Sequence, residues 1–334
     1  MGGTRRLDGT SGSMTVHPLT VSVVICAYTE KRWDMLTRAV DSVLEQSYPV
    51  AELIVCVDHN LELAERCKRN WDDSAAGSST PILILENKYA GRLGSARNTA
   101  VEYASGEIVA FLDDDASAHQ DWLALLMAPY QQAEVVAVGG APVPVFETAR
   151  PAWFPPQLDW VFGCYYDGLP SSLSSVDRLI GASMSARRDA LNAIGGFHSD
   201  NHDDMDMCLR LAHQHGHQAI LMEPRAVVYH NVVAERVTWN YLWRRCFFVN
   251  KGKVQAFRDM ESAASMKADV KFVTGAIKRS VVQCVRDLMR GDINGVSRLT
   301  VLVVALLLAA SGNIAGQISY LSTRASGFPR LSRE

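Results

Sequence analysis

The sequence predicts an α/β fold with a mainly parallel sheet, followed by C-terminal helices that associate with a membrane. Short apolar runs typical of buried strands alternate with helical segments roughly every 25 to 30 residues up to Leu112, which is the pattern of βαβ units. The fourth apolar run ends in three consecutive carboxylates, Asp113 to Asp115. The last third of the chain lacks this pattern and is instead basic and apolar.

Four strands and three helices are expected before the Asp run. The strands are short runs rich in Val, Ile and Leu, at 21–27, 53–57, 82–85 and 108–112. The helices have apolar residues at helical spacing, at 33–46, 61–71 and 94–104. Pro49 ends the first helix. Because Asp is unfavourable within strands, the fourth strand is expected to stop at Leu112.

The pattern is looser after Asp115. Helices are expected at 122–131 and 203–215, and strands at 135–139 and 219–229. Between them lies a stretch rich in proline and aromatic residues, 142–170, which is predicted to be a long loop. Such an insertion either lines a site or covers the sheet.

Composition excludes several classes of protein. The chain has 334 residues, 48% of them hydrophobic, which suffices for one large domain or one domain with an appendage. Its formal net charge of −3 does not favour nucleic-acid binding. The seven cysteines form no Cys-x-x-Cys pair, which favours reduced thiols in the cytosol over disulfides or a zinc site. Residues 1–19 lack the apolar core of a signal peptide and are expected to form a disordered tail, in which Met14 is a second candidate start.

The C-terminal part predicts membrane association. Residues 236–298 are expected to be helical, and 267–290 combine helical apolar spacing with Lys and Arg, as in a helix at an anionic membrane surface. An ordinary surface helix is the alternative. The apolar segment 299–321 is about long enough to span a bilayer, although Asn313 and Gln317 leave a buried hairpin or an interfacial helix open. If it spans, the preceding basic segment places the N-terminal domain, residues 20–235, at the cytoplasmic face of the membrane.

The three carboxylates after the fourth strand form the first candidate site. Adjacent carboxylates repel one another unless a cation neutralises them. Open α/β sheets bind their ligands at the carboxyl ends of strands. The run therefore indicates a site for a hard divalent ion, Mg²⁺ or Mn²⁺. A solvated turn with an Asp helix cap is the alternative.

Other polar residues follow the neighbouring strands. Glu30 follows the first strand, Asp58 ends the second, and Arg97 lies between the third and fourth, where it can meet an anionic ligand. Each alone is more typical of a cap, a turn or a helix surface. The chain lacks the glycine-rich motifs of dinucleotide-binding and P-loop proteins and the Gly-x-Ser-x-Gly elbow of hydrolases, which disfavours these classes.

A series of motifs, in this order, resembles family 2 glycosyltransferases over roughly residues 20–250. The motifs are Val21–Tyr28, Val57–Asp58, Gly94–Asn98, Phe111–Asp115, Gly181–Met184, Gly195–Phe197 and Asp203–Arg210. The resemblance implies a GT-A fold, which is Rossmann-like with a mainly parallel sheet and flanking helices. It also implies a nucleotide-sugar donor (UDP is the expected nucleotide), a divalent metal, and an inverting transfer to a hydroxyl of a glycan or lipid-linked acceptor in cell-envelope glycan or polysaccharide synthesis. Within the family, Pro151–Pro155 and the basic, apolar C-terminus look closest to enzymes acting on polyprenyl-linked glycans, such as archaeal glucosyl-dolichyl phosphate glucuronosyltransferases.

The resemblance also implies roles for individual residues. The base and ribose of the donor would be held by Ala27, Tyr28, Glu30 and Asp58, with Arg97 facing the nucleotide. Asp113 would contact the ribose and Asp115 would bind the metal. His230 matches a position that supplies a further metal ligand, although a strand-end histidine is the plain alternative. Asp204 matches the general base, which takes the proton of the acceptor hydroxyl.

Five more residues are candidates for phosphate or acceptor contacts: Asp203, Ser183, Arg210, Arg244 and Arg245. Asp114 is the member of the Asp run expected to tolerate substitution best. Two departures from the family pattern leave questions open, because His59 stands where a second acid is common, and Asp206 lies close to the Asp203–Asp204 pair.

Two other functions compete with glycosyl transfer. A sugar nucleotidyltransferase also uses a Rossmann-like sheet with metal-binding Asp residues, but it needs a Gly-rich, basic loop after the first strand, which residues 28–33 do not supply. A non-catalytic nucleotide-sugar-binding scaffold would have a degenerate site, whereas Asp113, Asp115, Asp204 and His230 are all present.

Overall fold

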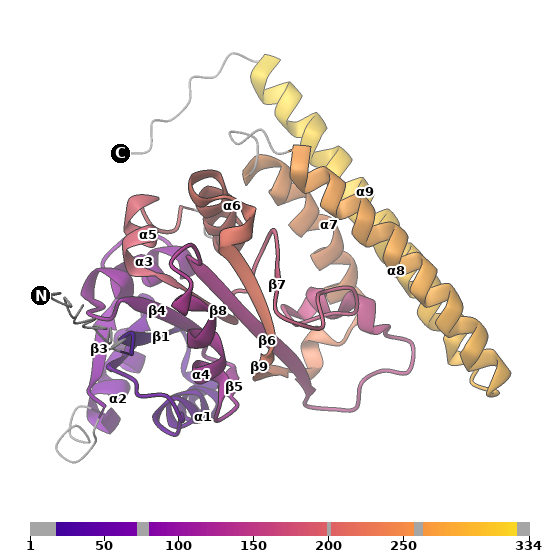
Figure 1. Ribbon diagram of the computed structural model, residues 1–334. Coiled ribbons are helices and arrows are strands. Elements are labelled where there is room, and N and C mark those ends of the chain that lie inside the picture. The colour runs from indigo at the N-terminus through magenta and orange to yellow at the C-terminus, as the bar shows by residue number, and fades with distance from the viewer. Residues whose placement is uncertain (1–17, 72–79, 199–201, 257–262, 326–334) are drawn as a thin grey trace, which may run out of the picture.

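The protein is built around one mixed sheet with helices on both faces and a long helical pair along one side (Figure 1). This computed structural model describes residues 18–71, 80–198, 202–256 and 263–325. The strands lie in the order β3-β2-β1-β4-β8-β6-β9-β5, and β7 pairs with β9 outside this path. Most of the expected disordered tail lies outside the described residues.

The first half of the sheet is parallel, as the sequence predicts. It contains β1 (Val21–Ala27), β2 (Glu52–Val57), β3 (Ile82–Glu86) and β4 (Ile108–Asp113). The connecting helices are α1 (Trp33–Leu44), α2 (Leu61–Trp71) and α3 (Leu93–Tyr103). Helices α1 and α2 bury Leu36 and Leu63 against one face of the sheet, while α3 packs Ala96 and Ala100 against the other. Strands β1, β2 and β4 are buried on both faces, which explains their continuous apolar runs, whereas β3, at the edge of the sheet, exposes Leu83.

One boundary differs from the prediction. Strand β4 does not stop at Leu112 but includes Asp113, which pairs with Cys26 of β1. The last residue of a strand sits at the rim of the sheet, so a carboxylate there is not forced into the apolar core.

The second half of the sheet is mixed. It contains β5 (Ala116–Ala118), β6 (Ala137–Phe146), β7 (Ser174–Ser175), β8 (Ser183–Arg187) and β9 (Ile220–Val232). Strand β8 runs antiparallel to both β4 and β6, whereas β6 and β9 are parallel. The helices of this half are α4 (Trp122–Met127), α5 (Arg188–Ala193) and α6 (Asp203–His215). The prediction of a mainly parallel sheet is therefore correct for the first half of the sheet only.

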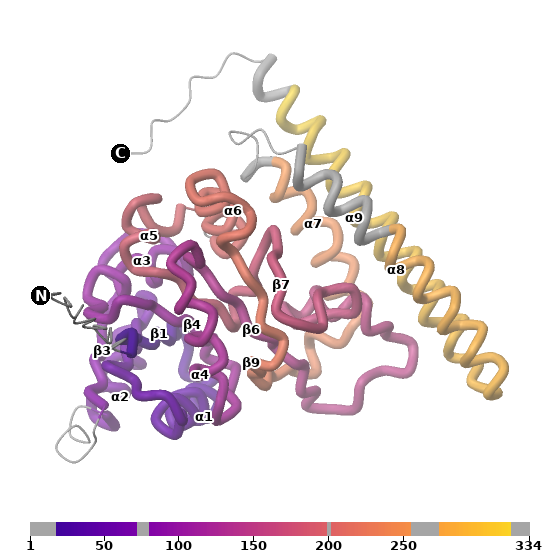
Figure 2. Tube along the Cα trace, viewed as in Figure 1, coloured from indigo at the N-terminus to yellow at the C-terminus, as the bar shows by residue number. Residues whose placement is uncertain are grey.

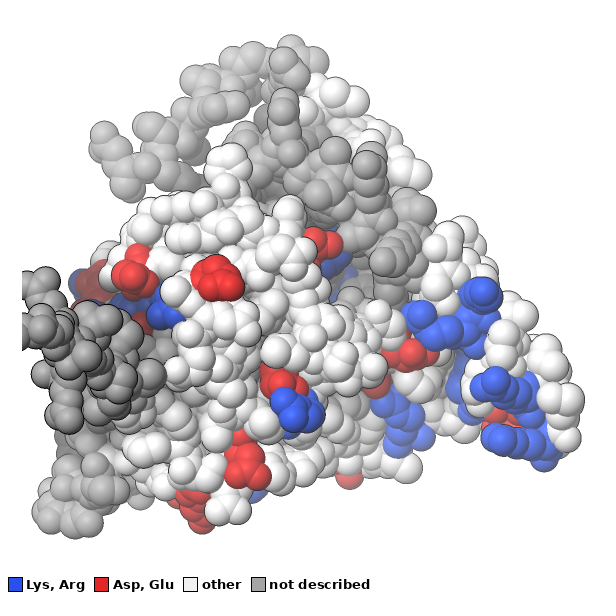
Figure 3. Space-filling view, viewed as in Figure 1, with Lys and Arg blue, Asp and Glu red and all other residues white. Residues whose placement is uncertain are grey.

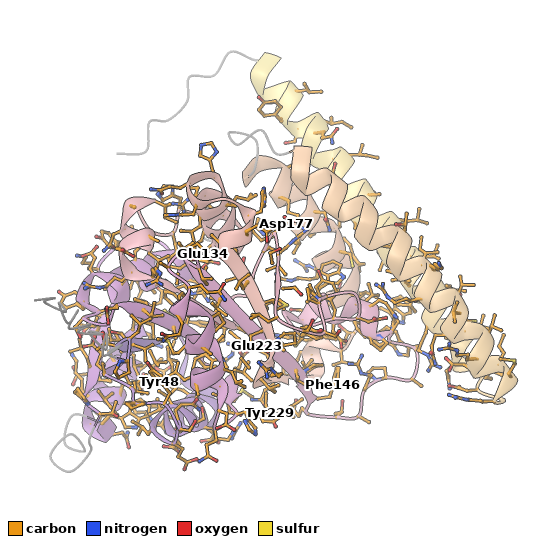
Figure 4. The ribbon with its side chains drawn as sticks, viewed as in Figure 1. Tyr48, Glu134, Phe146, Asp177, Glu223 and Tyr229 are labelled. Carbon is orange, nitrogen blue, oxygen red and sulfur yellow. The ribbon has the colours of Figure 1, made fainter. Side chains whose placement is uncertain are left out.

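Strand β6 continues into the proline-rich stretch that the sequence predicts to be a loop. Beyond Gly139 this strand no longer pairs with β8 and keeps only β9 as a neighbour. Pro142 and Pro144 are compatible with such an edge, where one side of the strand needs no N–H donors. In Figure 4, Phe146 marks the end of β6, where it pairs with Val232 of β9.

Three long helices follow the sheet: α7 (Trp239–Ala256), α8 (Ala263–Met289) and α9 (Asn294–Ala325). Helices α8 and α9 form a hairpin whose turn contains Gly291 with a φ of 78°. The tube in Figure 2 shows this hairpin along one side of the molecule, with α7 between it and the sheet. Among the described residues, one helical segment, Asn294–Leu321, is long and apolar enough to cross a membrane.

Candidate active site

The site lies at the end of β4, where side chains from β9 and from the start of α6 come close to the Asp run. Strand β4 ends in the Asp run, and β9 carries His230 opposite Ala116 of β5. Helix α6 begins with three carboxylates in its first turn, Asp203, Asp204 and Asp206. These segments are distant in sequence, and the sheet brings them to one rim, where α/β proteins bind small ligands.

Asp115 is held by three cationic or potentially cationic side chains. Its Oδ1 lies 3.1 Å from Nε2 of His230, and its Oδ2 lies 3.2 Å from Arg32 and 3.4 Å from Arg236. Burial alone would raise the pKa of Asp115, but His230, Arg32 and Arg236 outweigh it and hold the pKa well below its usual range. Asp115 is therefore an ionised, buried carboxylate.

His230 is buried between Asp115 and Cys164, whose Sγ lies 3.5 Å from Nδ1. Burial would lower the pKa of His230, but the hydrogen bonds to Asp115 and Cys164 raise it to about 10. His230 does lie near the end of β9, and it is buried and bonded to Asp115.

Asp113, Asp115 and His230 can together hold a metal ion. One ligand atom from each lies within 4.8 Å of the others. Two carboxylate oxygens and one imidazole nitrogen suit Mn²⁺. Mg²⁺ prefers oxygen ligands, which the two carboxylates supply. The residues present thus fit the divalent ion that the sequence predicts, without specifying which ion binds.

Asp114 has a structural environment of its own. It is 4% exposed, and its Oδ1 accepts a 2.6 Å hydrogen bond from Arg32, while its Oδ2 has no partner among the described residues. Burial and the adjacent carboxylates raise the pKa of Asp114 to about 7, against the opposing effect of Arg32. These contacts argue against the expectation that Asp114 tolerates substitution well.

Arg97 connects the Asp run to α6. Its guanidinium is buried, and it donates to Asp113 at 3.2 Å, to Asp203 at 2.5 Å and to the carbonyl of Gly181 at 3.0 Å. A planar guanidinium can serve three acceptors at once, which an ammonium cannot do in the same geometry. Arg97 therefore fixes β4, α6 and the loop before β8 relative to one another.

The three carboxylates of α6 have different surroundings. Asp203 is bound to Arg97, and Asp206 is bound to Arg210. Among the described residues, the hydrogen bonds that Asp204 accepts come from backbone amides, those of Gly181 at 3.1 Å and Met205 at 2.8 Å, and Asp204 is partly exposed. Of the three, Asp204 alone is open to a substrate and lacks a side-chain cation bonded to it.

The expected nucleotide side lies at the ends of β1 and β2. Asp58 accepts a 2.8 Å hydrogen bond from Asn87 and contacts the ring of His59 at 2.6 Å. Glu30 accepts from Asn60 at 3.0 Å. Tyr28 is 54% exposed, so its ring is available to a ligand. Ala27, the last residue of β1, is buried, so that a ligand meets its backbone more readily than its methyl group.

Ser183 and Arg210 do not reach this site. Ser183 is fully buried within β8, where its hydroxyl accepts from the indole of Trp122 at 2.8 Å. Arg210 is bonded to Asp206 and to the carbonyls of Ile194 and Gly196, which makes it a brace for the preceding loop. Both side chains are engaged in these contacts, which argues against the predicted contacts to phosphate or acceptor.

Arg244 and Arg245 are exposed on α7. Arg245 lies close enough to the start of α6 to contribute to lowering the pKa of His202. Both remain candidates for contacts to an anionic acceptor.

Sequence reasoning missed Arg32, Arg236 and Cys164. Arg32 ends a short 3-10 helix after β1, and no local pattern marks it. Arg236 follows β9 by four residues, and no local pattern marks it. Cys164 lies in the aromatic stretch, and its contact with His230 spans 66 residues of sequence. Such contacts depend on tertiary structure and leave no periodic trace in the sequence.

The sheet has a Rossmann-like parallel half and a mixed half, and an Asp-Asp-His cluster lies at its rim. This combination defines a glycosyltransferase of the GT-A class. The model of the family named Glycosyl transferase family 2 matches residues 22–195, more than half of the chain, and the protein belongs to this family. Two structures share the fold. A mannosyltransferase from Pyrobaculum calidifontis, solved with GDP-Man and Mn²⁺, has a TM-score of 0.58 at 18% identity and covers 90% of this chain and 88% of its own. The structure of GalNAc-T7 with UDP, GalNAc and Mn²⁺ has a TM-score of 0.50 at 18% identity, covering 65% of this chain and 44% of its own.

Two curated relatives act on lipid-linked sugars, by their names. The glucosyl-dolichyl phosphate glucuronosyltransferase of Haloferax volcanii is 29% identical over 243 residues, which are 70% of this chain and 76% of the relative. A UDP-Glc:alpha-D-GlcNAc-diphosphoundecaprenol beta-1,3-glucosyltransferase of Escherichia coli is 36% identical over 95 residues, 28% of this chain and 34% of the relative.

Proposed function

We propose that this protein is a metal-dependent, inverting glycosyltransferase that moves a sugar from a UDP-sugar to a hydroxyl of a lipid-linked glycan. The observation that supports this most directly is the junction at Arg97. This side chain bonds both Asp113, one of the candidate metal ligands, and Asp203, beside the candidate base. Donor and acceptor functions would therefore lie within a few ångströms of each other.

The donor would bind along the carboxyl ends of β1, β2 and β4. Tyr28 offers an exposed ring for the base, while Asp58 and Asp113 offer carboxylates for ribose hydroxyls. Glu30 is held in place by Asn60. Arg97, close to these groups, adds a fixed positive charge.

Asp113, Asp115 and His230 would hold a Mg²⁺ or Mn²⁺ ion. When bound, such an ion neutralises negative charge that develops on the leaving diphosphate. Arg32 and Arg236, which neutralise Asp115 here, would also face the diphosphate and favour its departure.

Asp204 would act as the general base. A carboxylate held only by backbone amides keeps lone pairs for an acceptor hydroxyl. It would take the hydroxyl proton as that oxygen forms a bond to the anomeric carbon and the bond to the diphosphate breaks. Attack from the face opposite the leaving group inverts the anomeric configuration.

The acceptor is proposed to be polyprenyl-linked because the relatives act on such compounds. This acceptor would bring the enzyme to a membrane, and the reduced cysteines favour its cytoplasmic face.

A nucleotide-release assay tests the proposal. A panel of nucleotide sugars is incubated with the enzyme, with a short polyprenyl-linked acceptor, and with Mn²⁺, Mg²⁺ or EDTA. We expect release of UDP that needs the metal and is lost in Asp115→Asn, while Asp121→Asn, which alters an exposed carboxylate, behaves like the wild type. Absence of metal-dependent release with every donor would favour a nucleotide-sugar-binding scaffold instead.

A further inference from the structure

The α8–α9 hairpin exposes an unusually apolar surface. Its exposed large apolar residues are Ile277, Val281, Val282, Val285, Leu288 and Met289 on α8, Ile293 in the turn, and Val296, Val303, Val304, Leu307, Ile314, Ile318 and Leu321 on α9. Met289 and Ile293, at the turn, are each 76% exposed. A continuous apolar face of this kind marks a membrane or protein contact.

If helix α9 crossed a bilayer, the helices packed against it would bring charged residues into the hydrocarbon layer. A Cβ on Gly312 would lie 2.2 Å from the carbonyl oxygen of Phe247, and one on Gly316 would lie 2.7 Å from that of Lys251. Helix α7 therefore runs parallel to α9 and in close backbone contact with it. Arg244 and Arg245, both exposed, lie close to the level of the middle of Asn294–Leu321.

Helix α8 brings further charges to the same region. Gly295 packs against Cys284 and Asp287, which fixes the antiparallel register of the hairpin. This register places Lys278 and Arg279 beside the first half of α9. They would therefore lie within the membrane if α9 spanned it. Charged side chains are strongly unfavourable within the hydrocarbon layer, so the register argues against a spanning helix.

The charges instead suit a helix pair lying in the plane of a membrane surface. On α8 the basic residues Lys278 and Arg286 follow directly after the apolar Ile277 and Val285, so a basic stripe flanks the apolar stripe. Figure 3 shows Lys and Arg gathered over the end of the hairpin. Lys278 and Arg286 also line a cavity of about 850 Å³ between α8 and residues 150–157, which gives room for a headgroup phosphate.

We propose that the α8–α9 hairpin is a monotopic anchor, with its apolar face inserted into one leaflet of an anionic bilayer and α9 parallel to the membrane. The charge pattern favours a lipid surface over a second copy of the chain. An antiparallel two-fold pairing of this face would bring the two basic stripes to the same side, where they repel each other. This inference does not depend on which sugar is transferred.

Vesicle flotation tests the apolar face and the basic stripe separately. We expect the full chain to float with vesicles of phosphatidylcholine containing about 30% phosphatidylglycerol and to bind pure phosphatidylcholine several-fold less. Leu307→Gln with Ile318→Gln should reduce binding to both by about tenfold. Lys278→Gln with Arg286→Gln should remove only the preference for the anionic lipid.

The matched control is Leu61→Gln, which alters a 71% exposed leucine on α2. It should float like the wild type, and thermal unfolding verifies that all variants are folded. If the Leu307/Ile318 variant floats normally, or if it only dissociates a dimer in size-exclusion chromatography, the proposal is wrong.

The orientation of α9 is tested by labelling single introduced cysteines in sealed proteoliposomes. Ser297 and Gln317 are exposed and about 30 Å apart along the helix, the thickness of the hydrocarbon layer. We expect a membrane-impermeant maleimide to label Ser297→Cys and Gln317→Cys from the same side, above the background of the parent protein. Labelling from opposite sides would show a spanning helix and overturn the proposal.

Discussion

The three carboxylates after β4 have three different environments. Asp113 faces Arg97 at the rim, Asp115 is enclosed by His230, Arg32 and Arg236, and Asp114 is buried against Arg32. Asp113 ends β4, whereas Asp114 and Asp115 form the turn before β5, so the three side chains leave the backbone in different directions. The three carboxylates therefore have different partners and do not act as a single negatively charged group.

Asp114→Ala should destabilise the fold. The substitution leaves Arg32, which is largely buried, with Asp115 as its only carboxylate partner among the described residues and opens a small void. We expect a loss of about 1 to 2 kcal/mol in the free energy of unfolding, measured by urea denaturation. Asp121→Ala, at an exposed carboxylate, should change the stability by less than about 0.5 kcal/mol. Equal stability of the two variants would show that Asp114 has no structural role.

His202 gives a pH dependence that can be separated from the candidate metal ligands. Burial, assisted by Lys253 and Arg245, lowers the pKa of His202 from 6.5 to about 4. Because the unfolded chain binds this proton more readily, the stabilisation is present above pH 6.5 and is lost as the pH falls towards 4. When the pH is lowered from 7 to 5, the free energy of unfolding should fall by about 2 kcal/mol more in the wild type than in His202→Gln.

Urea denaturation at both pH values measures this difference. His119→Gln, at a half-exposed histidine, is the control and should keep the dependence of the wild type. If His202→Gln keeps it as well, the pKa of His202 is not depressed in the folded protein.

The α7–α9 pair depends on glycine at two positions. Gly312 and Gly316 repeat every four residues on α9 and let its backbone touch that of α7. Small residues at this spacing permit close helix crossings. The sequence predicted helices in this region, but nothing in their apolar periodicity distinguished the face that packs on α7 from the face that stays exposed.

Gly312→Val should separate these helices. Its side chain would overlap the backbone carbonyl of Phe247, which cannot rotate away. We expect a loss of about 1 to 3 kcal/mol in unfolding free energy and faster proteolysis of α9. Ala310→Val, at an exposed position on the same helix, should have little effect on either measurement. Unchanged protease resistance in Gly312→Val would mean that the close crossing is absent in solution.

The sequence alone specified much of the molecule. The parallel half of the sheet was predictable because three of its four strands are buried on both faces and its helices pack apolar residues against it. The order of motifs led to the correct family, and the Asp run and His230 proved to be neighbours. The mixed half was less predictable, because β6 carries prolines that local rules assign to a loop and β8 is only five residues long.

The residues that position the site were the least predictable. Arg32, Arg236 and Cys164 act through contacts between distant segments, and single-sequence patterns do not encode such contacts. Ser183 shows the converse, since its motif suggested a site residue but the fold directs its hydroxyl to Trp122.

The division of work between donor binding and proton removal is the central claim, and Asp204→Asn tests it most directly. The measurement compares sugar transfer with donor affinity, using a UDP-sugar that the wild type turns over, in the presence of Mn²⁺. We predict that transfer falls by at least about a hundredfold, as expected for loss of a general base, while the dissociation constant of the donor changes less than about threefold. Turnover near that of the wild type would contradict the assignment of Asp204 as the base.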